Sequence, residues 1–277
     1  MSDYKRTIDV VITTSQNYNK NYSLYFTLRS ILSQTLLPNK IFVIENDNST
    51  KMKRMLDSDF GNFINFIDAS SNVENISYCR NLGASISCSD LILFMDDDVV
   101  IGDSDAIEKI VDRMRFLDFY CGALRFWSQI NWYNQLKKTY SINHVNNILK
   151  STSILPKSID RTTGTFNYHN YTFIGNFGCV RKDVFLEVNG FDENFKGWSY
   201  QDTDLMMRLT YARKEYQLMA DKGLKVYHLS HPVNKKATRE SNLILYEKKQ
   251  KEIGIKFHLN HFFADFNDDK YALFSHL

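Results

Sequence analysis

Residues 91–101 read Leu-Ile-Leu-Phe-Met-Asp-Asp-Asp-Val-Val-Ile, an apolar run that ends in three consecutive carboxylates. An unbroken apolar run of this kind is typical of a strand buried on both faces of a parallel sheet. Carboxylates at its C-terminal end would emerge at the rim where open α/β sheets bind ligands. Three adjacent negative charges repel one another, and a divalent cation relieves that repulsion because hard cations bind carboxylate oxygens. The alternative is a solvated acidic turn that closes the strand.

The composition excludes several classes of protein. The chain has 277 residues, 43% of them hydrophobic, and 34 basic against 32 acidic residues give a formal charge of +2. This balance does not indicate electrostatic attraction of the whole protein to nucleic acid or to an anionic membrane. No apolar stretch reaches the ~20 residues of a membrane span, and the N-terminus lacks the apolar run of a signal peptide. We therefore expect a cytoplasmic protein without a transmembrane segment.

The four cysteines, Cys79, Cys88, Cys121 and Cys179, are far apart in sequence or lie in apolar contexts, and none forms a Cys-x-x-Cys pair. This distribution predicts reduced core thiols rather than a metal site.

Hydrophobic periodicity predicts strands that alternate with helices in the first half of the chain. Such alternation indicates one mostly parallel, Rossmann-like sheet flanked by helices, the α/β class. Every polar cluster in this half falls at the C-terminal end of a strand, and therefore at one rim of the sheet. The predicted strands are 8–14, 40–44, 63–67, 91–95, 122–127, 173–180 and 224–227. The predicted helices are 24–37, 75–88, 106–117, 182–189, 202–213 and 238–253.

Familiar signatures of other nucleotide and hydrolytic enzymes are missing. The first strand is not followed by Gly-x-Gly-x-x-Gly, and the chain contains neither Gly-x-x-x-x-Gly-Lys-Ser/Thr nor Gly-x-Ser-x-Gly. A dinucleotide enzyme, a P-loop NTPase and an α/β-hydrolase are therefore disfavoured.

Several short motifs occur in a characteristic order. They are Glu45 at the end of the second strand, Arg80-Asn81-Leu82-Gly83, Asp96-Asp97-Asp98, Gly190-Phe191-Asp192-Glu193, Gly197-Trp198 and Gln201-Asp202-Thr203-Asp204-Leu205. With this order and spacing, residues 8–232 resemble the family 2 glycosyltransferases, which have the GT-A fold. The resemblance implies one GT-A domain at 1–235, with a nucleotide-binding half at 1–104 and a smaller acceptor-binding half at 105–235. Residues 236–277 would form a helical extension that packs on the domain.

The resemblance implies a metal site at the acidic strand end. Asp98 would coordinate Mn²⁺ or Mg²⁺, and Asp96 would share the metal or hold the donor's ribose. His228 would be a third ligand, although a histidine after a strand is also a common structural residue. The alternation of an extended strand predicts that Asp96 and Asp98 point to the same side and Asp97 to the other.

Other residues are assigned to the donor by the same resemblance. Arg80 would contact the nucleotide or its phosphates, with a solvated helix charge as the alternative. Glu45 would face the base or ribose, and Thr13 and Thr14 would line that pocket. Asp97 is included here as the least certain member of the acidic run.

On the acceptor side, the resemblance makes Asp202 the general base that takes the proton from the attacking hydroxyl. The family's preceding acid is replaced here by Gln201, which removes a charge beside the acceptor. Trp198, next to Gly197, would be a sugar platform or else a core anchor. Asn176 would reach the donor sugar, and Asp204 is the alternative base.

These assignments predict an inverting, metal-dependent transfer of a hexose or N-acetylhexosamine from a nucleotide sugar, most simply a UDP-sugar. Galactosyl- and N-acetylgalactosaminyl-transferring members are the most similar branches. The acceptor would be a saccharide, a lipid-linked intermediate or a peptide or protein side chain, and the polar, aromatic-rich segment 128–172 would cover the site. Two alternatives stay open: a sugar-binding relative without catalysis, and a sugar-nucleotide pyrophosphorylase. The latter normally has a Gly-rich loop after the first strand, which residues 13–17 lack.

Overall fold

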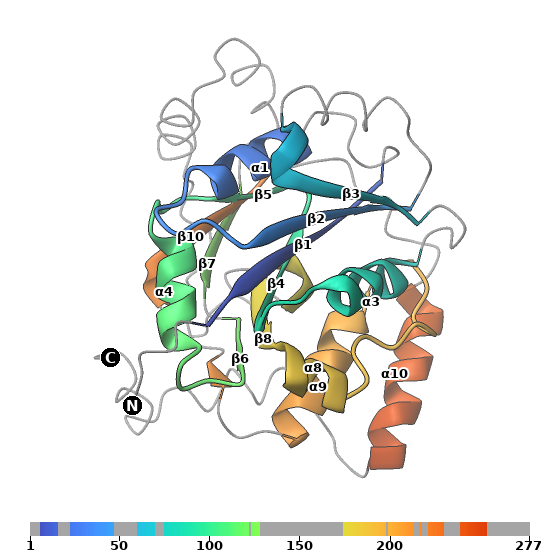
Figure 1. Cartoon of the computed structure of the whole chain (residues 1–277). Coiled ribbons are helices and arrows are strands. Elements are labelled where there is room, and N and C mark those ends of the chain that lie inside the picture. Colours follow the sequence, from blue (N-terminus) through green and yellow to red (C-terminus); the bar gives the residue numbers. More distant parts are fainter. Residues whose placement is uncertain are drawn as a thin grey trace.

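The first strand, β1 (Ile8–Thr14), lies near the middle of the main sheet because each of its edges pairs with another parallel strand, β2 (Lys40–Glu45) or β4 (Leu91–Asp96). The computed structural model describes residues 6–15, 23–46, 60–69, 75–121, 123–127, 174–197, 199–212, 216–217, 221–229 and 239–253. Within these ranges the main sheet has seven strands in the order β3-β2-β1-β4-β8-β6-β9 (Figure 1). The remaining members are β3 (Ile64–Asp68), β6 (Phe119–Tyr120), β8 (Gly178–Arg181) and β9 (Tyr216–Gln217).

The direction of these strands confirms the mostly parallel sheet. All of them run the same way except β8, which is antiparallel to both β4 and β6. The C-terminal ends of β1, β2 and β4 therefore meet at one rim, as the polar clusters predict. Thr14, Glu45 and Asp96 are the residues that end these three strands.

Alternate side chains of the central strands enter two hydrophobic cores, one on each face. Leu91 and Leu93 belong to the core that includes α1 (Ser23–Leu32) and α4 (Ala106–Arg113). Ile92 and Phe94 belong to the other core, with α3 (Ile76–Ile86), α8 (Lys182–Glu187) and α9 (Gln201–Ala212). A continuous apolar run satisfies both cores at once, which is why β4 carries no polar residue before its end.

A second, three-stranded sheet brings the two halves of the chain together. Its order is β5-β10-β7, where β5 (Val99–Ile101) is antiparallel and β7 (Ala123–Trp127) parallel to the central strand β10 (Asp221–His228). The pairing places His228 opposite Val99, next to the acidic run. The predicted strand 122–127 corresponds to β7, while Phe119 and Tyr120 just before it pair in the main sheet instead.

The prediction of one strand over 173–180 is wrong in its first half. Residues Ile174–Phe177 form a short helix, α7, and the strand β8 begins at Gly178. The chain turns here because two of its polar groups bind the site: the Gly175 N–H and the Asn176 amide donate to Asp202 and Asp96. The apolar character of the segment still reflects burial, since Ile174 and Phe177 are fully buried.

The remaining elements follow the predicted periodicity with shifted ends. A 3₁₀ turn, η1 (Gly61–Phe63), precedes β3, and α4 ends at Arg113 rather than near residue 117. The helix α10 (Arg239–Ile253) lies at the lower right of Figure 1, where its Lys249 approaches Asp204 of α9. Segment 128–172 and the tail after residue 253 fall outside the described residues. Among the helices that are described, none combines the length and apolarity needed to cross a membrane.

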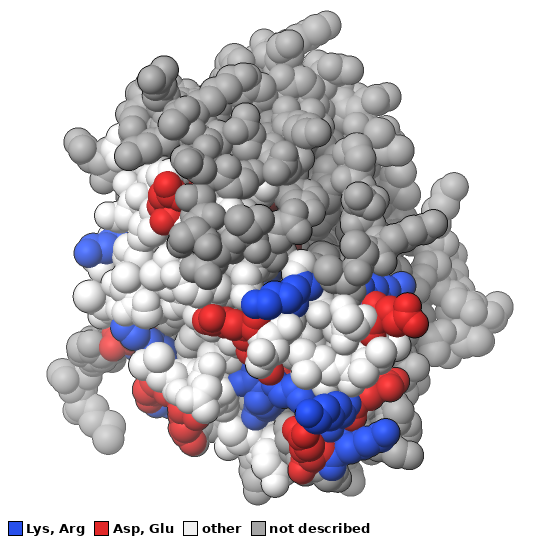
Figure 2. All heavy atoms as spheres, turned by 90° about the vertical axis from the view of Figure 1, so that its right-hand side faces the viewer, with Lys and Arg blue, Asp and Glu red and all other residues white. Residues whose placement is uncertain are grey.

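The molecular face that carries α10 has interspersed charges of both signs. Figure 2 shows that Lys and Arg alternate with Asp and Glu over its lower half. Lys248, for example, pairs with Glu252 at 3.7 Å on the outer side of α10. Over the described part of this face, side chains of the two signs are therefore mixed.

The fold predicts unequal reactivity of the four thiols. Cys79, Cys121 and Cys179 are buried and Cys88 is exposed, so the prediction of four core thiols is wrong for Cys88. Burial raises the pKa of Cys79 to about 12 and also raises the pKa values of Cys121 and Cys179. Titration of the folded protein with Ellman's reagent should modify one thiol rapidly and the other three after addition of denaturant. The rapid phase should vanish in Cys88→Ser; a second rapid thiol would contradict this burial.

Candidate active site

An ion bridge joins the two halves of the chain at the rim of the sheet. Arg80, on α3, donates to Asp96 Oδ1 at 3.0 Å and to Asp202 Oδ1 at 3.1 Å. The Arg80 side chain is only 4% exposed, and its guanidinium lies 5.0 Å from the centre of the Phe191 ring. Removing one partner of such a buried network typically costs about 3–5 kcal/mol, because a charge is left without compensation.

The turn α7 completes the surroundings of both carboxylates. The Asn176 amide donates to Asp96 Oδ2 at 2.7 Å, and the Gly175 N–H donates to Asp202 Oδ1 at 2.9 Å. A Cβ atom on residue 175 would lie 2.1 Å from Arg80 Cζ and 2.3 Å from Asp202 Oδ1. Glycine is therefore required here by close approach. Sequence reasoning missed this role, since Gly175 attracted notice only as a neighbour of Asn176.

The environment of Asp96 perturbs its titration. Burial raises its pKa to about 6, against the lowering effects of Arg80 and the Asn176 hydrogen bond. The nearby charges of Asp98 and Asp202 add to the increase. Concentrated negative charge of this kind is typical of sites that bind a cation or a cationic transition state, although structural ion networks perturb pKa values too.

The three acids of the run face three different partners. Asp96 belongs to β4, whereas Asp97 and Asp98 form a turn, so the strand alternation that predicts one side for Asp96 and Asp98 ends at Asp96. Asp97 accepts from Thr14 Oγ1 at 2.6 Å, and its main-chain oxygen accepts from Thr27 on α1 at 3.0 Å. Asp98 turns toward the second sheet.

Asp98 and His228 converge where the two sheets meet. Asp98 Oδ1 lies 3.5 Å from His228 Nε2, both side chains are 10% exposed, and Leu229 N–H donates to the Asp98 main-chain oxygen at 2.8 Å. A carboxylate oxygen and an imidazole nitrogen this close can share one divalent cation. No cluster of three or more His, Cys, Asp or Glu side chains suited to a metal occurs in the described part of the chain. Two protein ligands nevertheless fit Mg²⁺ or Mn²⁺ when substrate phosphates and water complete the shell.

The residues predicted to line a nucleotide pocket lie at the ends of β1 and β2. Thr14 pairs with Glu45 in the register of these strands, and both residues are at least 95% buried. Thr13, which pairs with Asp96, is partly buried. The structure places Thr13, Thr14 and Glu45 at the predicted rim, and their contact with a nucleotide stays a prediction.

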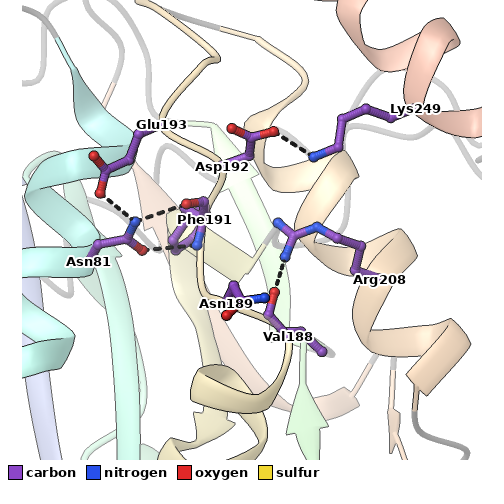
Figure 3. A pocket seen from close by; sticks show the side chains of 8 residues that line it. All are labelled: Asn81, Val188, Asn189, Phe191, Asp192, Glu193, Arg208 and Lys249. Atoms are coloured by element: carbon purple, nitrogen blue, oxygen red, sulfur yellow. Dashed lines mark hydrogen bonds and ion pairs between the residues drawn. The ribbon is translucent and has the colours of Figure 1, made fainter. Parts of the chain in front are cut away.

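The Gly-Phe-Asp-Glu motif begins the loop that leads to α9, and Asn81 of α3 holds it in place. Asn81 accepts from Phe191 N–H and donates to the Phe191 oxygen at 2.8 Å and to Glu193 Oε1 at 2.9 Å (Figure 3). Gly190 has a φ of +60°, and a Cβ there would lie 2.6 Å from Asn81 Oδ1, which explains the glycine. The motif thus shapes the chain that leads to Asp202.

Gln201 turns into the protein. Its side chain is nearly buried and donates to the Gly197 oxygen at 3.4 Å, a bond that a carboxylate could not make. The substitution of an amide for the family acid therefore supports the loop itself. Trp198 lies outside the described residues, so its predicted sugar contact is not placed.

Residues 10–230 of the chain match a family described as glycosyltransferase like family 2. The chain belongs to this family. A protein of Haloferax volcanii named glucosyl-dolichyl phosphate glucuronosyltransferase is 27% identical over 205 residues, which cover 67% of this chain and 55% of that protein. The chain therefore spans about half the length of this family 2 relative.

The fold of a solved glycosyltransferase is also similar. The crystal structure of GalNAc-T7 with UDP, GalNAc and Mn²⁺ superposes with a TM-score of 0.57 at 12% identity. The match covers 89% of this chain and 48% of that one. Together with the family match, this similarity confirms the GT-A fold predicted for this family 2 chain.

A double-mutant cycle tests the close contact at Gly175. Gly175→Ala should lower the free energy of unfolding by about 1–3 kcal/mol, the usual cost of overpacking a dense site. In an Arg80→Ala background the same substitution should cost clearly less, because the nearest atom to the added methyl group is gone. Urea denaturation of the four proteins measures this coupling. Equal costs in the two backgrounds would show that residue 175 does not press on Arg80.

Proposed function

We propose that this family 2 protein is an inverting glycosyltransferase that transfers a hexose or N-acetylhexosamine from a UDP-sugar to an acceptor hydroxyl. The observation that carries the proposal is the Arg80 bridge, which holds Asp202 beside Asp96, two residues before the Asp98 of the Asp98–His228 pair. A base, a donor-binding acid and a cation site thereby share one rim of the sheet.

In this proposal Asp202 is the general base. Its Oδ1 atom accepts from both Arg80 and Gly175 N–H, which fixes the orientation of the carboxylate. Its Oδ2 atom accepts from no residue in the part of the chain that the structure describes. We assign to Oδ2 the proton of the attacking hydroxyl, which leaves as the oxygen bonds to the anomeric carbon. The side chain is 23% exposed, so an acceptor can reach it.

Asp98 and His228 are the residues that would hold Mn²⁺ or Mg²⁺. When bound, the cation supplies positive charge against the developing charge of the departing nucleoside diphosphate. Asp96 has a different task in this scheme. Both of its oxygens already accept hydrogen bonds, from Arg80 and Asn176, which suits a residue that orients the donor ribose more than a metal ligand.

The relatives support the donor and narrow the acceptor. The GalNAc-T7 structure contains UDP and Mn²⁺, which supports a UDP-sugar and a divalent cation here. The name of the Haloferax volcanii relative includes a glycosylated dolichyl phosphate, so among the three acceptor classes we favour a lipid-linked saccharide. Screening of UDP-sugars by thermal shift with Mn²⁺ would identify the donor, and lipid-linked acceptors would then be assayed with that donor.

Metal-dependent sugar transfer separates this function from that of a sugar-binding relative without catalysis. Asp98→Asn and His228→Ala should each weaken Mn²⁺ binding in the presence of UDP by at least about tenfold, as loss of a ligand or its support does. Sugar transfer should fall in parallel. Calorimetric titration with Mn²⁺ measures the binding, and Asp105→Asn, an exposed acid that pairs with Lys109, is the matched control. Wild-type Mn²⁺ affinity and turnover in Asp98→Asn would overturn the metal assignment.

The role of Asp202 has its own test. Asp202→Asn keeps the shape and the hydrogen bonds to Arg80 and Gly175 but cannot take a proton. We expect turnover to fall by about 10²–10⁴-fold, the usual contribution of a general base, with unchanged UDP binding. Asp183→Asn, at an exposed site of the same chain, should have no effect. Turnover retained in Asp202→Asn would move the base to another residue.

A further inference from the structure

One side of α10 contacts the loop that leads into α9. Asn242, Tyr246 and Lys249 share this side because residues four and three apart are neighbours on a helix. All three touch the segment between Phe191 and Asp204. The outer side of the same helix carries solvated charges such as Lys248, whose side chain is 70% exposed.

Asn242 binds an unusual turn. Its amide donates to the Lys196 oxygen at 2.9 Å and to the Ser199 oxygen at 3.0 Å, and the residue is 3% exposed. Ser199 and Tyr200 have φ values of 103° and 67°, in the left-handed region that residues with a side chain seldom adopt. Such a conformation persists when surrounding contacts hold it. Asn242 supplies two of these contacts.

Tyr246 covers the end of the same turn. Its ring stacks on that of Tyr200, with centroids 5.4 Å apart and planes at 26°. The Tyr200 main-chain oxygen in turn accepts from Asp204 N–H at 2.8 Å, in the first turn of α9. Contacts from α10 therefore continue without interruption to the start of the helix that carries Asp202.

Lys249 fixes the charges on both sides of the turn. Its amino group lies 2.6 Å from Asp192 Oδ2 (Figure 3) and 2.8 Å from Asp204 Oδ1, and Asp204 is fully buried. Arg208 binds the other Asp204 oxygen at 2.6 Å. Arg208 and Lys249 line a cavity of about 380 Å³. Both cationic side chains are already paired with carboxylates. The cluster is therefore better suited to holding the loop than to binding an anionic ligand.

We propose that Asn242 and Lys249 are positioning residues for the sugar-transfer reaction, which they serve by fixing the 196–200 turn and with it the position of Asp202. The inference rests on the proposed role of Asp202 as general base. Asp202 is the second residue of α9, so a shift of the preceding turn moves its carboxylate relative to Arg80 and Gly175. Asn81 of α3 binds the start of the loop, at Phe191. The contacts of α10 hold the other end, which is nearer to Asp202.

The test uses the full chain and near-isosteric variants. Asn242→Leu removes both amide donors, and Lys249→Met removes the charge at nearly constant length. Each should lower kcat for transfer at least tenfold and leave KM for the UDP-sugar within twofold of wild type. Lys249→Arg, which keeps the charge, should restore most of the turnover, and Lys248→Met on the outer side of α10 should match wild type. Assays are run well below the unfolding midpoint of each variant.

Hydrogen exchange gives a second readout that does not depend on activity. Amides of residues 201–205 should exchange faster in Asn242→Leu and Lys249→Met, whereas amides of β1 and β4 should not change. Unchanged exchange at 201–205, unchanged kcat in Asn242→Leu, or a rise in KM with constant kcat would each overturn the positioning role. If Asn242→Leu or Lys249→Met does not fold, Lys249→Arg tests the positioning role by itself. A tenfold loss of kcat in Lys249→Arg, with hydrogen exchange as in wild type, would contradict that role. Absence of transfer by the wild-type protein would instead contradict the proposed function.

Discussion

The guanidinium of Arg80 joins carboxylates from two distant parts of the chain, Asp96 at the end of β4 and Asp202 at the start of α9. Two partly buried acids this close repel each other, and the shared Arg80 cation makes their approach favourable. The neighbouring features follow from this contact. Residue 175 has room for no side chain, and α7 interrupts what would otherwise be a continuous strand because its polar groups bind the same acids.

Much of the parallel half could be predicted from the sequence because its signals are local. A strand such as Leu91–Met95, buried on both faces, needs an unbroken apolar run, and a helix such as α3 needs apolar residues at helical spacing. The positions of Glu45, Asp96 and Thr14 at one rim then follow from parallel pairing alone. The chemical roles came from the resemblance to family 2. The family match and the similar fold agree with that resemblance.

The remaining features depend on contacts between distant residues, which periodicity does not record. Nothing local in 119–127 shows that Tyr120 and Ala123 enter different sheets, or that β8 runs against its neighbours. The site has the same limitation. Asp96 and Asp202 were candidates from their types and order, but their bridge through Arg80 required the packing of α3 against α7 and α9. The alternation of side chains along β4 likewise does not continue past Asp96, because the chain turns at Asp97.

The pairing of β5 with β10 has a consequence for how the protein reaches its native state. Asp98 lies next to β5 and His228 ends β10, so their contact closes a long stretch of chain. Long-range closure is entropically costly and slow compared with the formation of local βαβ units. The parallel strands β1, β2 and β4 can therefore assemble early, while the Asp98–His228 pair arises when β10 docks on β5. Formation of this pair therefore coincides with the docking of β10 on β5.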